Sequence, residues 1–369
     1  MHDLIVSPFL DDYLVVRPGH ASGIKIPLTR FLELKRAFDE HLESPVWLVD
    51  AARRTWNAEV GGLPADETLL VRNPSPYGYG RASYEINKGC DYDCPHCYLG
   101  QKKFEGLNWE HKAQLLEIMR DAGVLWLQIT GGEPLIDRLF PMVYTRAHAL
   151  GMMISISSNG SQLSKPPILD LLTKRRPYRI TLSVYGATAA TYDGFTRNRG
   201  AFDRFTRGLS AAREAELPVK LNLIVADDNA HELGAMQALA EQYGFPHQTY
   251  ANMSPTIAGG SEPLPTQAAD FLRQRKPFGG CNAGHTFFHA DPFGVASICK
   301  VGRDPNIRLI EEGVEGLRRL GEIADSLMLR TGGCSGCSLS GTCWTCRPLA
   351  KLYQEAKAPK RTYCQHSER

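Results

Sequence analysis

The chain has 369 residues, which exceeds one typical domain and predicts about two or three units, each able to bury a core. With 42 Lys and Arg against 40 Asp and Glu, it lacks the large electric field that attracts nucleic acid or anionic lipid. No secretory signal begins the sequence and no run of about 18 apolar residues predicts a membrane span, so we expect a cytoplasmic protein that binds neither nucleic acid nor a membrane.

The first 80 residues predict a small separate unit. A β-like run at residues 13–16 precedes two stretches of apolar periodicity, residues 28–42 and 46–56, and this order predicts a winged-helix-like fold. Residues 73–80 (NPSPYGYG) are dense in Pro and Gly, so we expect them to end the unit as a linker.

From residue 81 to 253 short β-rich runs alternate with helical stretches. This alternation predicts an α/β fold with a parallel sheet of right-handed βαβ units, and six units make a partial (β/α)6 TIM-type barrel. The expected strands are residues 83–87, 124–130, 152–157, 179–184, 220–225 and 248–251. The expected helices lie near residues 109–122, 138–150, 167–174, 201–216 and 230–243.

The remaining residues divide into a linker and a Cys-rich unit. Residues 254–280 are rich in Pro, Gly and Ser and are expected to cross the top of the barrel. Within residues 281–369 we expect a β-hairpin at 287–299, a helix at 314–329 and Cys/Gly-rich loop elsewhere. Such a segment has little apolar periodicity and would need metal to hold a fold.

Ten cysteines in a reducing compartment point to metal ligands rather than disulfides. Cys90, Cys94 and Cys97 follow the first barrel strand, and three thiolates in one loop can converge on one iron-sulfur or zinc centre. Zinc would need a fourth ligand, and His96 is badly placed because it stands between two ligating neighbours. A cluster held by three cysteines instead leaves one iron open to a substrate.

The spacing Cys-x3-Cys-x2-Cys at this position resembles the defining motif of the radical S-adenosylmethionine (AdoMet) superfamily, and Tyr98 fits the aromatic residue that often follows it. The resemblance implies a 4Fe-4S cluster whose open iron is chelated by the amino and carboxylate groups of AdoMet. A zinc knuckle is the alternative.

Further motifs of that superfamily follow the next strands. Gly131, Gly132, Glu133 and Pro134 follow the second strand and resemble the motif that holds the AdoMet amino group, although alone they would be an ordinary turn. The other expected contacts lie at carboxyl ends of strands, where barrel enzymes assemble their sites. The resemblance assigns ribose and carboxylate contacts to Ser157, Asn159 and Ser183, with Arg197 or Arg199 as a further carboxylate contact or an ordinary surface arginine.

The seven later cysteines resemble the SPASM extension of radical AdoMet peptide-modifying enzymes, including the glycine five residues before Cys299. Four of them form two CxxC pairs, Cys334 with Cys337 and Cys343 with Cys346, and these alone could bind zinc. The other three cysteines would then have no role. The chain departs from the SPASM pattern at one point, because two residues, rather than the usual three, separate Cys343 from Cys346, the last two cysteines of the central group. The resemblance assigns one auxiliary cluster to Cys334, Cys337, Cys343 and Cys364 and the other to Cys281, Cys299 and Cys346.

The second of these sets has three thiolates only. We expect either an open iron or a fourth ligand that is not cysteine, and the nearby candidates are His285, His289 and Asp291, each of which is also an ordinary hairpin residue. Both auxiliary clusters are expected to be of the 4Fe-4S type.

The resemblance implies an oxidoreductase that generates a 5′-deoxyadenosyl radical and abstracts hydrogen from a residue of a ribosomally made precursor peptide. The product would be an oxidative modification such as a cross-link, and an external donor such as flavodoxin or ferredoxin would supply electrons. The N-terminal unit would grip the leader of the precursor by strand addition, unless its role is structural. No general base is evident in the sequence.

Two other functions are compatible with parts of the sequence. Sulfatase maturases share this architecture and form formylglycine on a protein, but in them an acidic residue follows the cysteine found here at position 299, and this chain has Lys300. A non-catalytic iron-sulfur electron carrier, or a zinc-binding regulator, would have no use for the barrel pattern or for residues 131–134.

Overall fold

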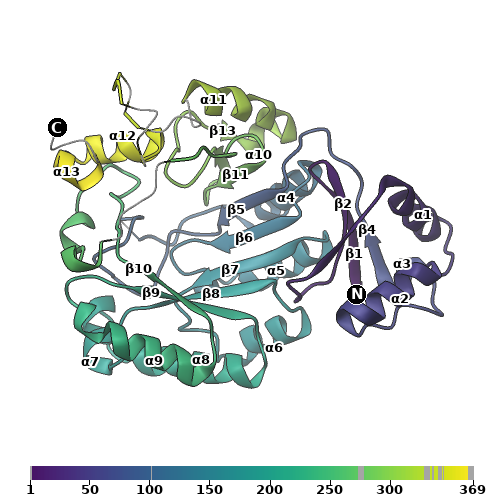
Figure 1. Ribbon diagram of the computed structural model, residues 1–369, viewed down its shortest axis with the longest axis horizontal. Helices are drawn as coiled ribbons and strands as arrows, with labels where there is room; N and C mark the ends of the chain where they lie inside the picture. Colours follow the sequence, from purple (N-terminus) through teal and green to yellow (C-terminus); the bar gives the residue numbers. More distant parts are fainter. Residues whose placement is uncertain are drawn as a thin grey trace.

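The computed structural model describes residues 2–100, 102–272, 278–327, 333–334, 336–339, 343 and 345–364. Its strands form two sheets, one of four strands near the N-terminus and one of nine strands through the rest of the chain (Figure 1). No described helix has both the length and the apolar content needed to cross a membrane.

The N-terminal unit is a four-stranded sheet with three helices on one face. Alternate residues of its first strand face opposite ways: Leu4 and Val6 join the core under the helices, and Ile5 packs against Leu125 and Met153 where two barrel strands begin. The expected strand and both expected helices are confirmed, whereas the other strands were not predicted. The elements are β1(Leu4–Phe9), β2(Asp12–Val16), β3(Gly23–Ile26), α1(Leu28–Asp39), α2(Val46–Trp56), α3(Ala65–Thr68) and β4(Leu69–Val71), in the sheet order β3-β2-β1-β4.

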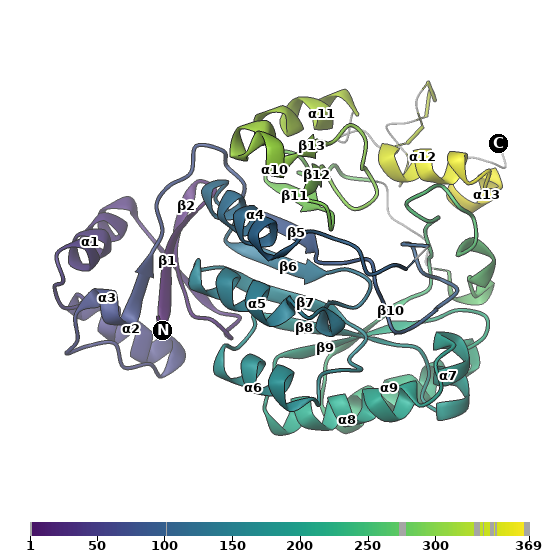
Figure 2. The same ribbon diagram turned by 180° about the vertical axis from the view of Figure 1, so that it is seen from behind.

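Six parallel strands follow, each paired with its neighbour in chain order, which confirms the expected α/β fold with a parallel sheet. Helices cover their outer face (Figure 2). The strands are β5(Arg81–Glu85), β6(Trp126–Thr130), β7(Met153–Ser158), β8(Arg179–Val184), β9(Val219–Ile224) and β10(His247–Tyr250). The expected helices are α4(Trp109–Asp121), α5(Phe140–Ala149), α6(Pro166–Lys174), α8(Ala201–Glu214) and α9(Leu233–Tyr243).

One barrel helix, α7(Ala189–Thr196), was not predicted from the sequence. It is only two turns long and contains Gly194, so it shows little apolar periodicity. Its start is fixed instead by Thr188, whose side chain accepts a hydrogen bond from the Thr191 N–H.

Residues 254–272 pass beside the cysteine loop, because the Ile257 N–H donates to the Tyr98 carbonyl at 2.8 Å. The hairpin that follows was predicted, but its position was not: β11(Phe287–Ala290) pairs in parallel with β5 and extends the barrel sheet. β12(Val295–Ser297) and β13(Ile307–Arg308) then continue the sheet in antiparallel order.

The last part of the chain is more helical than expected. The predicted helix at 314–329 is a 3-10 helix, η5(Val314–Arg319), followed by α11(Leu320–Ser326), and residues 328–329 lie outside the described residues. The prediction of loop beyond it was wrong at α12(Arg347–Glu355), because this short helix buries Leu352 and Tyr353 along one narrow stripe. The other described α-helices of this part are the short α10(Leu309–Glu312) and α13(Lys360–Tyr363).

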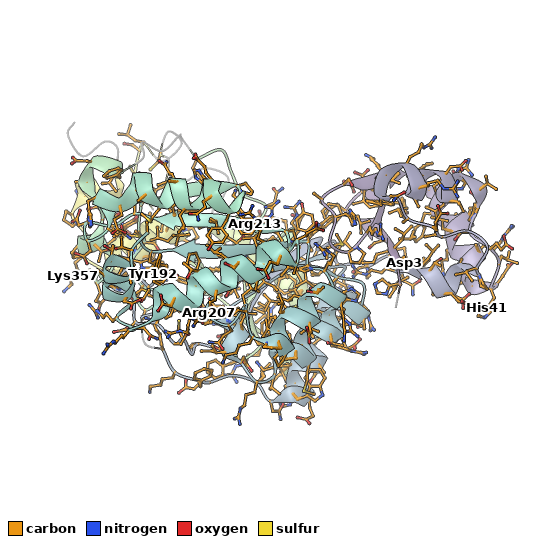
Figure 3. The ribbon with its side chains drawn as sticks, turned by 90° about the horizontal axis from the view of Figure 1, so that it is seen from below. Asp3, His41, Tyr192, Arg207, Arg213 and Lys357 are labelled. Atoms are coloured by element: carbon orange, nitrogen blue, oxygen red, sulfur yellow. The ribbon has the colours of Figure 1, made fainter. Side chains whose placement is uncertain are left out.

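The N-terminal unit and the Cys-rich segment lie at opposite ends of the barrel strands. Figure 3 shows Asp3 and His41 at one end of an elongated molecule and Tyr192 and Lys357 at the other. The carboxyl ends of β5 to β8 therefore face away from the N-terminal unit.

Candidate active site

The three cysteines of the first motif lie together in the loop between β5 and α4. Cys94 is buried and the other two are half-buried. Burial, followed by the charge of Glu133, raises the pKa of Cys90 to about 12, and burial raises that of Cys94, to which the adjacent Cys90 and Cys97 contribute. Thiols in such surroundings stay protonated until a metal displaces their protons.

These thiols fit an iron-sulfur cluster by donor type and proximity. No group of three or more His, Cys, Asp or Glu side chains in the described ranges is already arranged to coordinate a metal. The loop is nevertheless braced around the thiols, because Lys102 donates to the Tyr92 carbonyl at 3.0 Å and Asn159 donates to Asp91 at 2.7 Å. A cluster held there would supply one electron at a time through its open iron.

A cavity of about 220 Å³, here called the strand-end pocket, opens beside the thiols at the carboxyl ends of the barrel strands. It unites nine residues that the sequence predicted: Cys90, Cys94, Cys97, Tyr98, Gly131, Gly132, Ser157, Asn159 and Ser183. It also includes eight that the sequence analysis did not assign to a site: Tyr92, His96, Leu99, Lys102, Thr130, Ser158, Tyr185 and Lys300.

Four predicted residues do not line this pocket: Glu133, Pro134, Arg197 and Arg199. Glu133 is fully buried, and its carboxylate accepts hydrogen bonds from the Asn159 N–H at 2.6 Å, the Ser158 hydroxyl at 2.7 Å and the Leu135 N–H at 2.9 Å. Glu133 therefore holds the loop after β7 in place. The groups of this motif that can bind a cofactor in the pocket are the backbone groups of Gly131 and Gly132.

Arg197 lies outside the pocket as the residue that ends α7. Its backbone is left-handed, with a φ of 50°, and its guanidinium pairs with the exposed Asp93 at 3.1 Å. It lines a separate, more open cavity together with Cys94, Cys97 and residues 256–258, so this structure places it behind the cysteine loop.

The glycine pair allows the loop after β6 to touch the cysteine loop. A Cβ on Gly132 would lie 2.1 Å from the Gly89 carbonyl oxygen, and the Glu133 N–H donates to that same oxygen at 2.8 Å. Gly131 has a φ of +148°, which also excludes a side chain. The close approach sets the distance between the backbone after β6 and the cysteines.

We expect Gly132→Ala to lower the free energy of unfolding by about 1–3 kcal/mol because the added methyl group must displace the backbone before Cys90. It should also weaken AdoMet binding, measured by equilibrium dialysis under anaerobic conditions. The matched control is Gly234→Ala in α9, where an added Cβ meets nothing within 4 Å. That change should raise stability by about 0.5–1 kcal/mol, and equal effects at the two glycines would contradict the assignment.

The protonation of Glu133 gives a second test. Burial raises its pKa to about 8. Between pH 4.5 and 8 the folded protein then holds a proton that the unfolded chain releases, so stability falls as pH rises. We expect a slope of up to about 1.4 kcal/mol per pH unit in urea unfolding, which Glu133→Gln should remove. An unchanged slope in the variant would contradict this prediction.

Comparisons with known proteins agree with this geometry. Residues 84–240 match the Radical SAM superfamily, a range that holds the three cysteines and the motifs after β6, β7 and β8. These residues resemble a radical SAM domain. Domains of this family bind AdoMet and a 4Fe-4S cluster, which agrees with the cofactors expected for Cys90, Cys94 and Cys97.

The individual relatives share low sequence identity with this chain and align with only part of it. Over 71% of its length it is 25% identical to the Fe-coproporphyrin III synthase of Methanosarcina barkeri, and over 43% it is 27% identical to the PqqA peptide cyclase of Xanthomonas campestris pv. campestris. The aligned regions cover 65% and 43% of those two proteins. The crystal structure of Streptococcus suis SuiB bound to precursor peptide SuiA shares the fold over 94% of this chain and 97% of SuiB, with 13% identity and a TM-score of 0.61.

A buried charge network joins the barrel to the Cys-rich unit. Glu85, at the end of β5, is fully buried and accepts hydrogen bonds from the Tyr98 hydroxyl at 3.0 Å and from Arg303 at 2.8 Å. His289 on β11 lies 3.6 Å from the other carboxylate oxygen, and its second ring nitrogen bonds Ser83 at 2.8 Å. We call this network the seam.

The seam keeps one carboxylate ionised inside the protein. Burial opposes ionisation of Glu85, but His289 and Arg303 outweigh it and lower its pKa to about 2. Burial also lowers the pKa of His289, so at neutral pH the imidazole is uncharged and Arg303 is the cation that stabilises Glu85. The position of Glu85 at a strand end was a signal that the sequence analysis did not use.

The later cysteines are distributed as two separate sets. Burial and the nearby Cys299 and Cys281 thiols raise the pKa of Cys346 to about 11. Burial also raises the pKa of Cys334, whose neighbouring thiols belong to Cys343, Cys337 and Cys364. These neighbours are the members of the two expected auxiliary sets.

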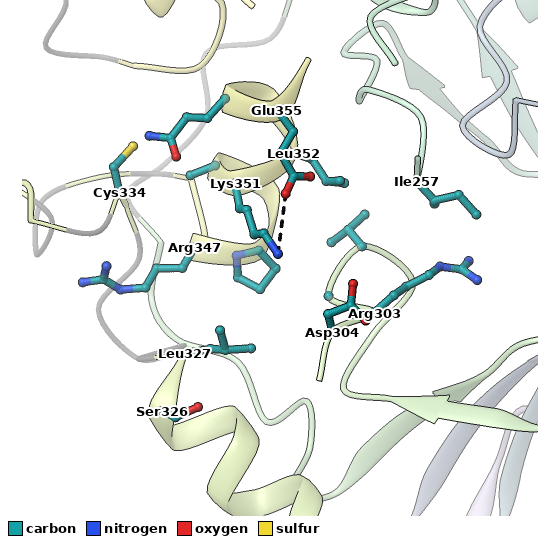
Figure 4. Close-up of a pocket in the computed structure, with 15 residues that line it drawn as sticks. Ile257, Arg303, Asp304, Ser326, Leu327, Cys334, Arg347, Lys351, Leu352 and Glu355 are labelled. Carbon is teal, nitrogen blue, oxygen red and sulfur yellow. Dashed lines mark ion pairs between the residues drawn. The ribbon is translucent and has the colours of Figure 1, made fainter. Parts of the chain in front are cut away.

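A cavity of about 290 Å³ separates α12 from residues 301–304 and reaches Cys334. Figure 4 shows Arg347, Lys351 and Glu355 projecting from α12 at its border, with Lys351 paired to Glu355 at 3.5 Å. It lies beside both expected auxiliary cysteine sets, because Cys334 of one set lines it and Gly302, which also lines it, approaches the sulfur of Cys299 of the other.

The three candidates for a fourth auxiliary ligand each have a partner in this structure. His285 contacts Asp325 at 2.9 Å and His289 belongs to the seam. Asp291 accepts hydrogen bonds from the N–H groups of Phe293 and Val295 and so forms the turn of the hairpin. These contacts use Nε2 of His285 and Oδ1 of Asp291, so they do not engage the second donor atom of either residue, whereas both ring nitrogens of His289 belong to the seam.

Proposed function

We propose that this protein is a radical AdoMet oxidoreductase that modifies a ribosomally made precursor peptide oxidatively, for example by forming a cross-link. The observation that carries the proposal is the strand-end pocket, in which three cysteines, the glycine pair after β6 and polar strand ends meet. Bound AdoMet supplies a 5′-deoxyadenosyl radical once one electron has cleaved its carbon–sulfur bond.

The residues of the pocket would position the cofactor and shield it from water. Cys90, Cys94 and Cys97 would hold the 4Fe-4S cluster, and the backbone at Gly131 and Gly132 would bind the amino group of AdoMet. The strand-end residues Ser157, Asn159 and Ser183 would contact its ribose and carboxylate, and Tyr98 would close one wall. Such positioning matters because the target hydrogen must lie close to the radical before water or protein quenches it.

We assign the seven later cysteines to two auxiliary 4Fe-4S clusters in a SPASM unit. The thiols that raise the pKa of Cys334 and those that raise the pKa of Cys346 belong to different sets, which supports this assignment. Clusters at these positions would accept the second electron when the substrate radical is oxidised, and flavodoxin or ferredoxin would provide the first.

A peptide substrate is favoured by the N-terminal unit, which the fold of peptide-bound SuiB also covers. Its edge strand β3 pairs on one side with β2, and no described strand pairs with its other side. An extended leader peptide adding to such an edge gains main-chain hydrogen bonds.

A second candidate is the modification of a tetrapyrrole. It is favoured by the relatives from Methanosarcina barkeri, an AdoMet-dependent heme synthase and the Fe-coproporphyrin III synthase, which match 52% and 71% of this chain. Formylglycine formation has less support because Lys300, a cation, lines the pocket where sulfatase maturases would place an acid.

The deciding experiment is anaerobic reconstitution with iron and sulfide, followed by incubation with AdoMet and dithionite. We expect 5′-deoxyadenosine and methionine in equal amounts, and intact AdoMet would refute the proposal. Adding peptides encoded beside the gene, or Fe-coproporphyrin III, then separates the two candidates: the true substrate changes in mass only when AdoMet is present.

A further inference from the structure

One residue of the strand-end pocket comes from outside the barrel. Of the seventeen residues that line the pocket, Lys300 alone lies beyond residues 84–240. It follows Cys299 directly and enters the pocket from the Cys-rich unit, with its ammonium 6.0 Å from the centre of the Tyr98 ring. The auxiliary unit therefore contributes one positive charge to the site where AdoMet is expected.

The seam fixes the backbone that carries this lysine. Arg303 donates to the Lys300 carbonyl at 2.9 Å while its other nitrogen holds Glu85 at 2.8 Å. The Gly302 N–H donates to the Cys299 carbonyl at 3.2 Å, which closes the loop into a tight turn. Because both ends of the turn are held, the lysine is presented to the pocket from a defined position.

The charge of Lys300 has no carboxylate partner among the described residues. Lys102, the other lysine of the pocket, pairs with Asp93 at 3.2 Å. Glu85 is the nearby acid, but Tyr98 and Arg303 already occupy it and it is sealed from the pocket by burial. An ammonium that is partly removed from water and has no direct ion pair costs free energy, which a bound anion would recover.

We propose that Lys300 binds a carboxylate of the substrate and so holds the reacting carbon near the radical. The inference rests on the proposed function and deepens it, because it predicts an acidic group beside the modified position. A carboxylate has two possible sources, an Asp or Glu residue of a peptide and a propionate group of a tetrapyrrole. The carboxylate of AdoMet itself is expected on the open iron of the cluster, which leaves the ammonium to the substrate.

The test measures binding without turnover. Reconstituted holoenzyme with AdoMet and no reductant is dialysed against two pools of random hexapeptides. The pools differ only in that one contains Asp and Glu where the other contains Asn and Gln. A parallel dialysis uses coproporphyrin III and its tetra-amide. Mass spectrometry of the retained ligands gives the acid-to-amide ratio, and the same preparations are assayed for AdoMet affinity, iron content and thermal unfolding.

We expect the wild type to retain one of the two acids about tenfold or more over its amide, the preference that a charge-assisted hydrogen bond provides. The acid that is retained identifies the source. Lys300→Met should abolish the preference, with Lys300→Gln as a second variant if the first folds poorly, and Lys300→Arg should keep it. Lys174→Met, at an exposed lysine near the end of α6, is the matched control and should behave as the wild type.

The inference would be overturned by no acid preference in the wild type, by a preference that survives in Lys300→Met, or by its loss in Lys300→Arg with normal folding. A fall in AdoMet affinity in Lys300→Met would instead assign the lysine to the cofactor and equally overturn it. Failure of the proposed function is distinguishable, since it appears as intact AdoMet after dithionite is added to the wild type.

Discussion

A protein in which Cys90, Cys94 and Cys97 are all replaced by alanine is expected to cleave no AdoMet and to lose about one third of its iron. The reason is that these thiols lie together beside the strand-end pocket, apart from the two later sets of cysteines. Iron and sulfide assays of anaerobically reconstituted protein, with 5′-deoxyadenosine measured after dithionite is added, check both parts.

The matched control replaces Cys334 and Cys337, which belong to the set at the far end of the Cys-rich unit. This variant should also lose about one third of its iron but should still cleave AdoMet slowly without substrate. Residual cleavage in the triple variant, or zinc in place of iron in the wild type, would contradict the assignment of the first cluster.

The second large effect is expected at the seam. Arg303→Met should lower the free energy of unfolding by about 3–5 kcal/mol because it leaves the carboxylate of Glu85 buried without its cation. The double variant Glu85→Gln/Arg303→Met should recover most of this loss, since it removes the buried charge as well. Urea unfolding of the holoenzyme at pH 7 measures both values.

The pH dependence of this effect has a definite sign. Because the pKa of Glu85 is lowered to about 2, its stabilising contribution is complete above the pKa of about 4.5 in the unfolded chain and is lost as pH falls toward 2. The difference between wild type and Arg303→Met should therefore shrink in acid. Arg318→Met, which breaks the exposed pair with Glu315, is the control and should leave the free energy of unfolding almost unchanged.

Two outcomes would contradict this account of the seam. A small effect of Arg303→Met at pH 7 would mean that Glu85 is neutral or that water reaches it. A double variant less stable than Arg303→Met would mean that the glutamine cannot replace the hydrogen bond with Tyr98.

Local patterns in the sequence predicted the barrel well because each strand and most helices are defined by their own residues. The polar groups at Ser157, Asn159 and Ser183 were also predictable, since parallel strands bring their carboxyl ends to one edge. The motif residue Glu133 shows the limit of this approach. Its position after a strand is visible in the sequence, whereas its burial under the Ser158 loop is not.

The features that sequence patterns did not reveal depend on contacts between distant segments. The pairing of β11 with β5 joins Phe287 to Arg81, and nothing in either segment specifies the other. Lys300 and Glu85 acquire their roles only through this pairing, because it brings the loop after Cys299 to the mouth of the pocket. A single sequence without relatives cannot show such a contact.

The packing of β1 against Leu125 and Met153 has a consequence for the length of a precursor. If the N-terminal sheet holds one part of a peptide and the thiols serve another, the chain between them must run past the full height of the barrel. The six residues of β7 alone span about 20 Å, so at least about six extended residues must separate the gripped segment from the modified one. A shorter spacer would leave the residue to be modified out of reach. The enzyme would then select substrates by the length of this spacer as well as by recognition of the gripped segment.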